Sequence, residues 1–152
     1  MRHTNIFKEQ IVLFLVMFIL GITLNPMNIL AYRFSDLFLS LTLIYGGLLM
    51  ASNMIWAHQI VHYINYNHFN KHVFFIGILC SLFFAFVLRN QLFVNNYNWL
   101  KRMIGHHSTA ITTTEKLLKD RSNFENKESL FRLAKAIVYN QRLEIALMKQ
   151  ML

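Results

Sequence analysis

Six residues in the last third of the chain are of types that bind transition metals, and they recur at helical spacing. They are Met103, His106, His107, Gln141, Glu144 and Met148. Side chains three or four residues apart are neighbours on a helix, so Met103 can share an ion with either histidine, and Glu144 with Met148. Thioether sulfur suits Cu(I), whereas imidazole suits copper and zinc. The set therefore fits Cu(I), Cu(II) or Zn²⁺.

The residues around these groups predict two helices that fold back on each other. Apolar side chains recur at three- and four-residue steps over about 97–119 and again over about 127–152. Two helices joined by a short loop pack antiparallel. Reflection about a turn near residue 123 or 124 places Met103 level with Glu144, and the two histidines level with residues 140 and 141. We therefore expect the polar groups of the two helices to converge.

Two interpretations of this cluster remain open. In the first, the groups hold a metal ion. In the second, they form a buried polar cluster, histidine to glutamate and histidine to glutamine, that sets the register of the hairpin. Adjacent residues on a helix point about 100° apart, so only one histidine can sit squarely in the seam. His107 shares its stripe with Met103 and Ala110, which leaves His106 to reach another chain or the membrane helices.

The composition of the chain is that of a membrane protein. Hydrophobic residues make up 55% and charged residues only 14%, whereas soluble domains carry roughly 25% charged residues. Three apolar stretches run over about 11–31, 37–57 and 73–94, and about 20 residues suffice for a helix to cross a bilayer. We expect an all-α protein with a three-span membrane region at 1–94 and a hairpin domain at 95–152. Pro26 should kink or end the first helix.

The second expected span carries a stripe of residues that could also bind metal. Met50, Met54, His58 and His62 are four residues apart, so they follow one slowly drifting line on the helix. This stripe can hold or pass a soft ion. Alternatively, the methionines pack against other helices and the histidines lie at the membrane interface. Gly47 and Ala51 form a small-residue pair that predicts close approach of another helix.

Several classes of function are disfavoured. The net charge is +8, but the basic residues are interspersed with acids along helical patterns, which is typical of a face near lipid headgroups; we expect no nucleic-acid partner. Cys80 is the single cysteine, which excludes a disulfide within the chain and a cysteine-based zinc site. The sequence has no nucleophile motif, no glycine-rich phosphate loop and no paired-carboxylate di-iron motif. We expect a protein that is not an enzyme.

The segment MIGHHSTAI, followed by LAKAIVYNQRLEIALMKQML, resembles the signature of the domain of unknown function 305 family. The matching residues are Met103, Ile104, His106, His107, Ala110 and Ile111, then Leu133, Ala134, Ile137, Gln141, Glu144, Ile145 and Met148. Upstream, LIYGGLLMASNM and VLRNQLFVNN resemble the second and third spans of three-span members. Gly105 departs from the family's usual proline, and His58 and His62 lie where relatives tend to have methionine.

The resemblance implies a ferritin-like half bundle and handling of copper or silver outside the cytoplasm. We therefore expect a multi-pass integral membrane protein that binds copper through its hairpin, with zinc or silver as other ions and the hairpin on the extracytoplasmic side. Its expected partners are the lipid bilayer and a second copy, in a homo-oligomer formed through the hairpin or the membrane helices. The alternative is a structural or interaction protein whose polar hairpin residues only set the register.

Overall fold

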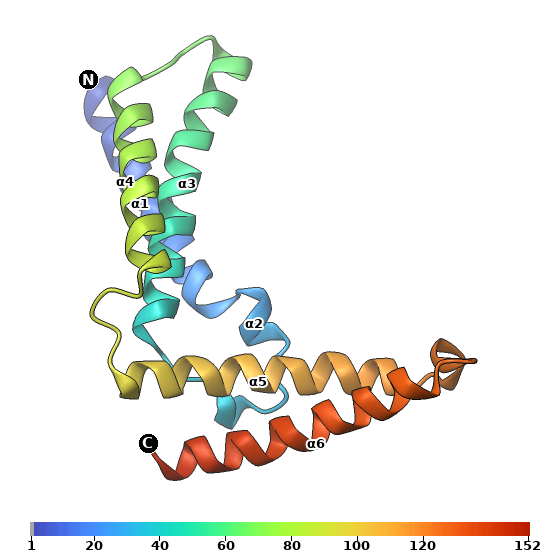
Figure 1. The fold of residues 1–152 in the computed structure, drawn as a ribbon. Coiled ribbons are helices and arrows are strands. Elements are labelled where there is room, and N and C mark those ends of the chain that lie inside the picture. Colours follow the sequence, from blue (N-terminus) through green and yellow to red (C-terminus); the bar gives the residue numbers. More distant parts are fainter. Residues whose placement is uncertain (1) are drawn as a thin grey trace. The chain divides into compact units, whose positions relative to one another are not determined.

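The computed structural model describes residues 2–152, with side chains from residue 7 onward, and over this range the fold is helical without strands (Figure 1). The expected all-α class is confirmed. The elements are α1 (Arg2–Thr23), α2 (Pro26–Ile29), η1 (Phe34–Asp36), α3 (Leu41–Tyr66), α4 (Lys71–Arg89), α5 (Asn96–Leu118), η2 (Arg121–Phe124) and α6 (Glu128–Gln150).

Pro26 ends the first helix, as predicted. Helix α1 stops at Thr23, and Pro26 is the first residue of the one-turn helix α2. A proline has no N–H to offer, and the first turn of a helix is where that group has no backbone partner. The Asn25 side chain caps the new helix by accepting a hydrogen bond from the backbone N–H of Asn28 over 3.1 Å. The chain therefore changes course within the first apolar stretch.

The first compact unit comprises the chain up to Leu24 together with Leu41–Phe93, so it contains α1, α3 and α4. Helix α3 packs against both of its neighbours. Small residues allow this: a Cβ at Gly21 would lie 2.9 Å from the Cα of Gly47, and Ala51 is fully buried. A Cβ at Gly77 would lie 2.9 Å from the backbone nitrogen of Trp56. The close approach expected at Gly47 and Ala51 is confirmed.

Two segments of the described chain, and not three as expected, are long and apolar enough to cross a membrane. They are Phe7–Ile29 and Lys71–Arg89. Helix α3, which contains most of the expected span 37–57, is long enough, but polar residues such as Asn53, His58 and Gln59 lower its mean hydropathy. Two polar side chains of α3, those of Ser52 and Gln59, are buried inside the protein.

The last expected span, 73–94, is also shorter than predicted. Helix α4 ends at Arg89 and is capped by Asn90. The next residues turn, with positive φ angles at Gln91 and Phe93. The Gln91 side chain accepts a hydrogen bond from the Thr42 hydroxyl over 2.7 Å, which ties this turn to the start of α3. The third apolar stretch therefore does not run as one helix into the hairpin.

The second compact unit comprises Asn25–Ser40 and Val94–Leu152. Its two long helices, α5 and α6, lie side by side in opposite directions (Figure 1). Their shared core consists of Leu100, Ile104, Ile111, Ile145 and Met148. Helix α2 and η1 pack against α5, so a segment from the expected membrane region groups with the hairpin. This grouping could not be read from hydropathy, because residues 25–40 are a short, mixed stretch between apolar runs.

We expect Gly77→Ala to destabilise the first unit by about 1–3 kcal/mol, because the added methyl group would overlap backbone atoms of Trp56 that cannot move independently. Gly46→Ala is the matched control, since a Cβ there has nothing within 4 Å. That change should be neutral or stabilising, as alanine favours helix over glycine. Thermal unfolding in detergent micelles, followed by circular dichroism, compares the two. Equal melting of Gly77→Ala and the parent would contradict the close packing.

Candidate functional site

The seam between α5 and α6 brings His107 to Glu144, whereas reflection about the turn placed the histidines level with residues 140 and 141 and Met103 level with Glu144. Nδ1 of His107 lies 2.8 Å from Oε2 of Glu144. The amide of Gln141 approaches the same carboxylate oxygen at 3.4 Å, which is long for a hydrogen bond. The Glu144 side chain remains about half exposed, whereas that of His107 is mostly buried. The pair therefore sits at the edge of the hairpin and not in its apolar core.

This contact assigns distinct roles to the two imidazole nitrogens. Nδ1 of His107 lies 2.8 Å from Oε2 of Glu144 without the geometry of a hydrogen bond, and a carboxylate this close favours the proton on Nδ1. In the neutral ring, Nε2 then carries a lone pair. A histidine that binds a metal usually donates its other N–H to a carboxylate or carbonyl, which fixes the ring and raises its basicity. Glu144 can therefore orient His107 instead of binding an ion itself.

The other predicted members of the hairpin cluster lie in different surroundings. Met148 belongs to the buried core of the unit, and Met103 packs against that core while remaining partly exposed. His106 is exposed, and its ring centroid lies 5.9 Å from that of His107. Of the two histidines, it is therefore His107 that the structure turns toward α6. The two thioethers are adjacent to the site but serve first as packing groups.

In the first unit, the predicted stripe on α3 is largely turned toward the protein. Met54, His58 and His62 are partly buried, and Met50 is 43% exposed. The rings of His58 and His62 have centroids 5.2 Å apart. The structure adds Glu9 of α1 to these two histidines, since ligand atoms of the three residues all lie within 4.8 Å of one another.

Glu9 was missed by reasoning from the sequence. A signal was available, because Glu9 is one of two acidic residues before Arg89 and directly precedes a long uncharged stretch that is mostly apolar. Such a carboxylate beside a membrane segment needs a partner. The sequence does not tell which of the several histidines supplies that partner, since the pairing depends on how α1 is set against α3.

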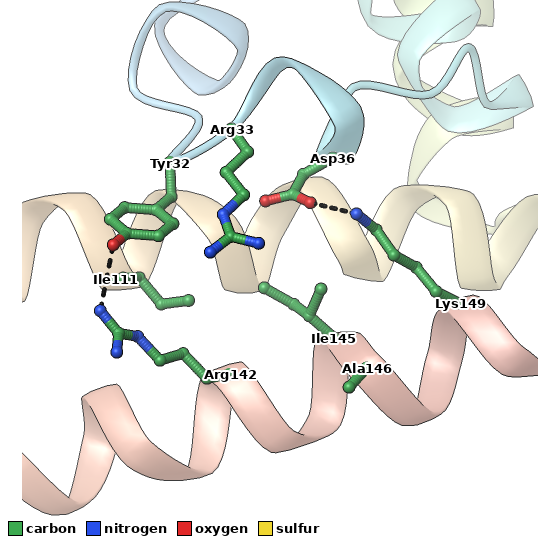
Figure 2. Close-up of a pocket in the computed structure, with 8 residues that line it drawn as sticks. All are labelled: Tyr32, Arg33, Asp36, Ile111, Arg142, Ile145, Ala146 and Lys149. Carbon is green, nitrogen blue, oxygen red and sulfur yellow. Dashed lines mark hydrogen bonds and ion pairs between the residues drawn. The ribbon is translucent and has the colours of Figure 1, made fainter.

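A cavity of about 240 Å³ lies where the 32–36 segment crosses the hairpin (Figure 2). Its lining is formed by Tyr32, Arg33, Asp36, Ile111, Arg142, Ile145, Ala146 and Lys149. Arg142 donates to the hydroxyl of Tyr32 over 3.0 Å and also pairs with Glu115. Arg33 lies over the Tyr32 ring, 5.6 Å from its centroid. Charged groups here are mostly matched within the protein, so this region fastens the segment to the hairpin.

Asp36 is the centre of that attachment. Its carboxylate is 2% exposed and accepts hydrogen bonds from Nζ of Lys149 over 2.5 Å and from the hydroxyl of Ser108 over 2.7 Å. Ser108 in turn accepts from the backbone N–H of Tyr32 over 2.7 Å. A buried carboxylate without such partners would be strongly unfavourable. One carboxylate therefore joins the 32–36 segment to both α5 and α6.

Two groups of the second unit, Arg102 and Asp120, have pKa values lowered by their surroundings. Burial lowers the pKa of Arg102, whose guanidinium contacts the sulfur of Met27. Hydrogen bonds from the hydroxyl and backbone N–H of Ser122 hold the pKa of Asp120 below its usual value. Both shifts are explained by structural roles, and the second stabilises the turn before α6.

Comparison with known proteins yields one match. Residues 93–152 match the family described as Domain of unknown function (DUF305). The C-terminal hairpin is similar to this family. The match covers α5, η2 and α6, and thus His107, Gln141 and Glu144, while α1, α3 and α4 lie outside it. It supports the resemblance seen in the double-histidine motif. No curated protein and no solved structure matches the chain.

We expect Lys149→Met to destabilise the second unit by about 3–5 kcal/mol, because it leaves the buried Asp36 carboxylate without its cation. Arg132→Met is the matched control, since its pair with Glu128 is exposed on both sides. Such a surface pair contributes only about 0.3–0.5 kcal/mol. Hydrogen exchange of α5 and α6 amides measures both changes in the full-length protein. Similar protection in the two variants would show that Asp36 does not hold the segment.

Proposed function

We propose that this protein is an integral membrane protein that binds copper through its C-terminal hairpin, without being an enzyme. The observation that carries the proposal is the 2.8 Å contact between His107 and Glu144 across α5 and α6. The carboxylate beside Nδ1 leaves Nε2 as the nitrogen whose lone pair can bind a metal ion. The contact lies inside the segment that matches the family, on the residues of the double-histidine motif.

The proposed ligands come from the predicted cluster, which consists of Met103, His106, His107, Gln141, Glu144 and Met148. His107 supplies the central nitrogen. Met103 lies one turn earlier on the same helix and is partly exposed, so its flexible thioether can rotate toward the same ion. An imidazole with a thioether favours Cu(I), and the nearby carboxylate extends the range to Cu(II) or Zn²⁺. Silver is the other soft ion to be tested.

The membrane assignment is supported by the surfaces of α1 and α4. Large apolar side chains are exposed along both helices, among them Val12, Leu15, Val16 and Ile19 on α1, and Leu79, Leu82, Phe83 and Phe86 on α4. Apolar surface of this extent is unfavourable in water and suits lipid or another helix. We place the hairpin on the extracytoplasmic side, following the family resemblance. The bilayer, with a second copy of the chain, is the proposed environment.

A second candidate function is that of a structural or interaction protein. The specific observation in its favour is that Met148 is part of the apolar core, and that His107 and Glu144 lie within ion-pair distance of each other across the seam. In this case the polar pair fixes the register of α5 against α6 and binds no metal. The two functions differ in what happens when the charge of Glu144 is removed.

Replacement of Glu144 by glutamine separates the two candidates. For a copper site we expect Glu144→Gln to weaken Cu(I) affinity about 10- to 100-fold, because the ring of His107 loses its charged orienting partner. His107→Ala should abolish binding at this site. The measurement is a competitive titration of the purified full-length protein in detergent with Cu(I) and a chromophoric chelator.

Glu128→Gln is the matched control, since it removes an exposed carboxylate from the same helix, where its partner is Arg132. Its affinity should equal that of the parent. For a register pair, Glu144→Gln would change the melting temperature while no stoichiometric binding is seen in any variant. Absence of tight Cu(I) binding by the parent would overturn the copper proposal.

A further inference from the structure

One end of the contact between α1 and α3 gathers two imidazoles and a carboxylate. We propose that Glu9, His58 and His62 form a Zn²⁺ site in the first unit, with Gln10 as the residue that positions His58. All four residues belong to this unit, and none lies in the segment that matches the family. The site is therefore independent of the copper site proposed for the hairpin.

The arrangement of the three ligands follows from helix geometry. His58 and His62 are four residues apart on α3, so their rings lie on the same face, with centroids 5.2 Å apart. Glu9 extends from α1 toward them, and its Oε1 lies 3.9 Å from Nε2 of His58. That distance is too long for a hydrogen bond. The two groups therefore face each other across a gap instead of pairing directly.

The gap is close to the size that a zinc ion requires. Bonds of about 2.0–2.1 Å to nitrogen and oxygen place neighbouring ligand atoms of a tetrahedral site about 3.3 Å apart. The three ligand atoms here lie within 4.8 Å of one another, so closing on an ion takes side-chain movements of about 1 Å. The side chain of Glu9 is 55% exposed and can make such a movement by rotation. No helix needs to shift.

The second observation is the buried amide of Gln10. This side chain is 7% exposed, lines an otherwise mainly apolar cavity of about 280 Å³, and lies 3.1 Å from Nδ1 of His58. Its Oε1 has no hydrogen-bond partner among the described residues. The oxygen and nitrogen of an amide exchange places by a half-turn of the terminal group. In that orientation Oε1 accepts Nδ1–H and leaves the lone pair of Nε2 facing Glu9.

An amide oxygen on the far nitrogen is the arrangement found behind metal-binding histidines, where it fixes the ring and raises its basicity. The buried position of Gln10 makes this contact rigid. A surface cluster of acid and histidine formed by chance would not require a buried polar group of this kind, since burial of an unsatisfied amide is costly. The packing of α1 on α3, through the buried Gln10, thus fixes the position of His58.

The chemistry of the three groups favours zinc over copper. Two imidazoles and a carboxylate form a set that binds Zn²⁺ with a fourth position open to water or another ligand. The set contains no thioether, unlike the hairpin cluster. His68, in the turn after α3, is exposed, and its ring centroid lies 6.2 Å from that of His62. It is the nearby group that can fill the fourth position.

The test is a titration of the purified full-length protein in detergent micelles with ZnCl₂, and with Co²⁺ as a spectroscopic substitute. Visible d–d absorption of Co²⁺ reports tetrahedral coordination by nitrogen and oxygen. We expect stoichiometric binding by the parent, loss of binding with His58→Ala or His62→Ala, and weaker binding with Glu9→Gln. Because Glu9 is half exposed, the last variant keeps the fold, which circular dichroism checks.

Four further variants assign the result. His72→Ala removes an exposed histidine from α4 in the same unit and should leave the affinity unchanged. Gln10→Met should weaken binding about 10- to 100-fold, whereas Gln10→Glu should retain it, because a carboxylate accepts the same Nδ1–H. Glu144→Gln, which tests the hairpin, should not change the Co²⁺ spectrum.

The proposal is overturned if the parent shows no tetrahedral Co²⁺ spectrum. It is also overturned if His72→Ala lowers the Zn²⁺ affinity as much as His58→Ala, since binding would then not belong to this cluster. A loss of the Co²⁺ spectrum in Glu144→Gln, with none in Glu9→Gln, would place the ion in the hairpin and overturn the second site. Equal affinity of Gln10→Met and the parent would overturn the positioning role.

Discussion

The structure depends on a simple constraint, which is that a polar group removed from water must find a partner inside the protein. Asp36 is the clearest example of this constraint. Its carboxylate is almost fully buried, and it is stabilised by a cation from α6 and a hydroxyl from α5. A short segment that has little apolar surface of its own is thereby bound to two long helices. Removal of either partner leaves a charge that the interior cannot solvate.

The same constraint separates structural from chemical polar groups in the hairpin. Asp36 is buried and paired with Lys149, whose side chain is about one-third exposed, so both charges serve to hold the unit together. His107 and Glu144 also meet, but at the edge of the seam, where the carboxylate remains in contact with water. A matched pair at such an edge keeps one imidazole nitrogen available. This difference in position, and not in residue type, is why the second pair is the one that we propose for metal binding.

In the first unit, close packing of helix backbones brings polar side chains from different helices together. Gly21 and Gly47 let α1 approach α3 so closely that a methyl group would not fit between them. On the same pair of helices, nearer the N-terminus, Gln10 is buried against His58 and brings Glu9 beside the histidines. Ser52 and His58 of α3 thus face α1 within the unit. Polar residues of this kind make α3 less apolar than α4, and the outer surfaces of α1 and α4 carry large hydrophobic side chains.

The sequence by itself determined the helical elements, because apolar periodicity, a single proline and asparagine caps are local signals. It predicted the end of α1 before Pro26 and the two hairpin helices to within a few residues. Reflection about the turn placed the histidines level with residues 140 and 141, since two antiparallel helices with a short turn have little freedom of register, whereas the structure brings His107 to Glu144, about one turn further along α6. Only the tertiary structure decided that Asp36 joins the hairpin, that Glu9 meets His58, and that a turn after Arg89 separates the third apolar stretch from the hairpin. The first two depend on partners about 50 to 110 residues apart, whose meeting is set by packing and by the need to pair buried charges.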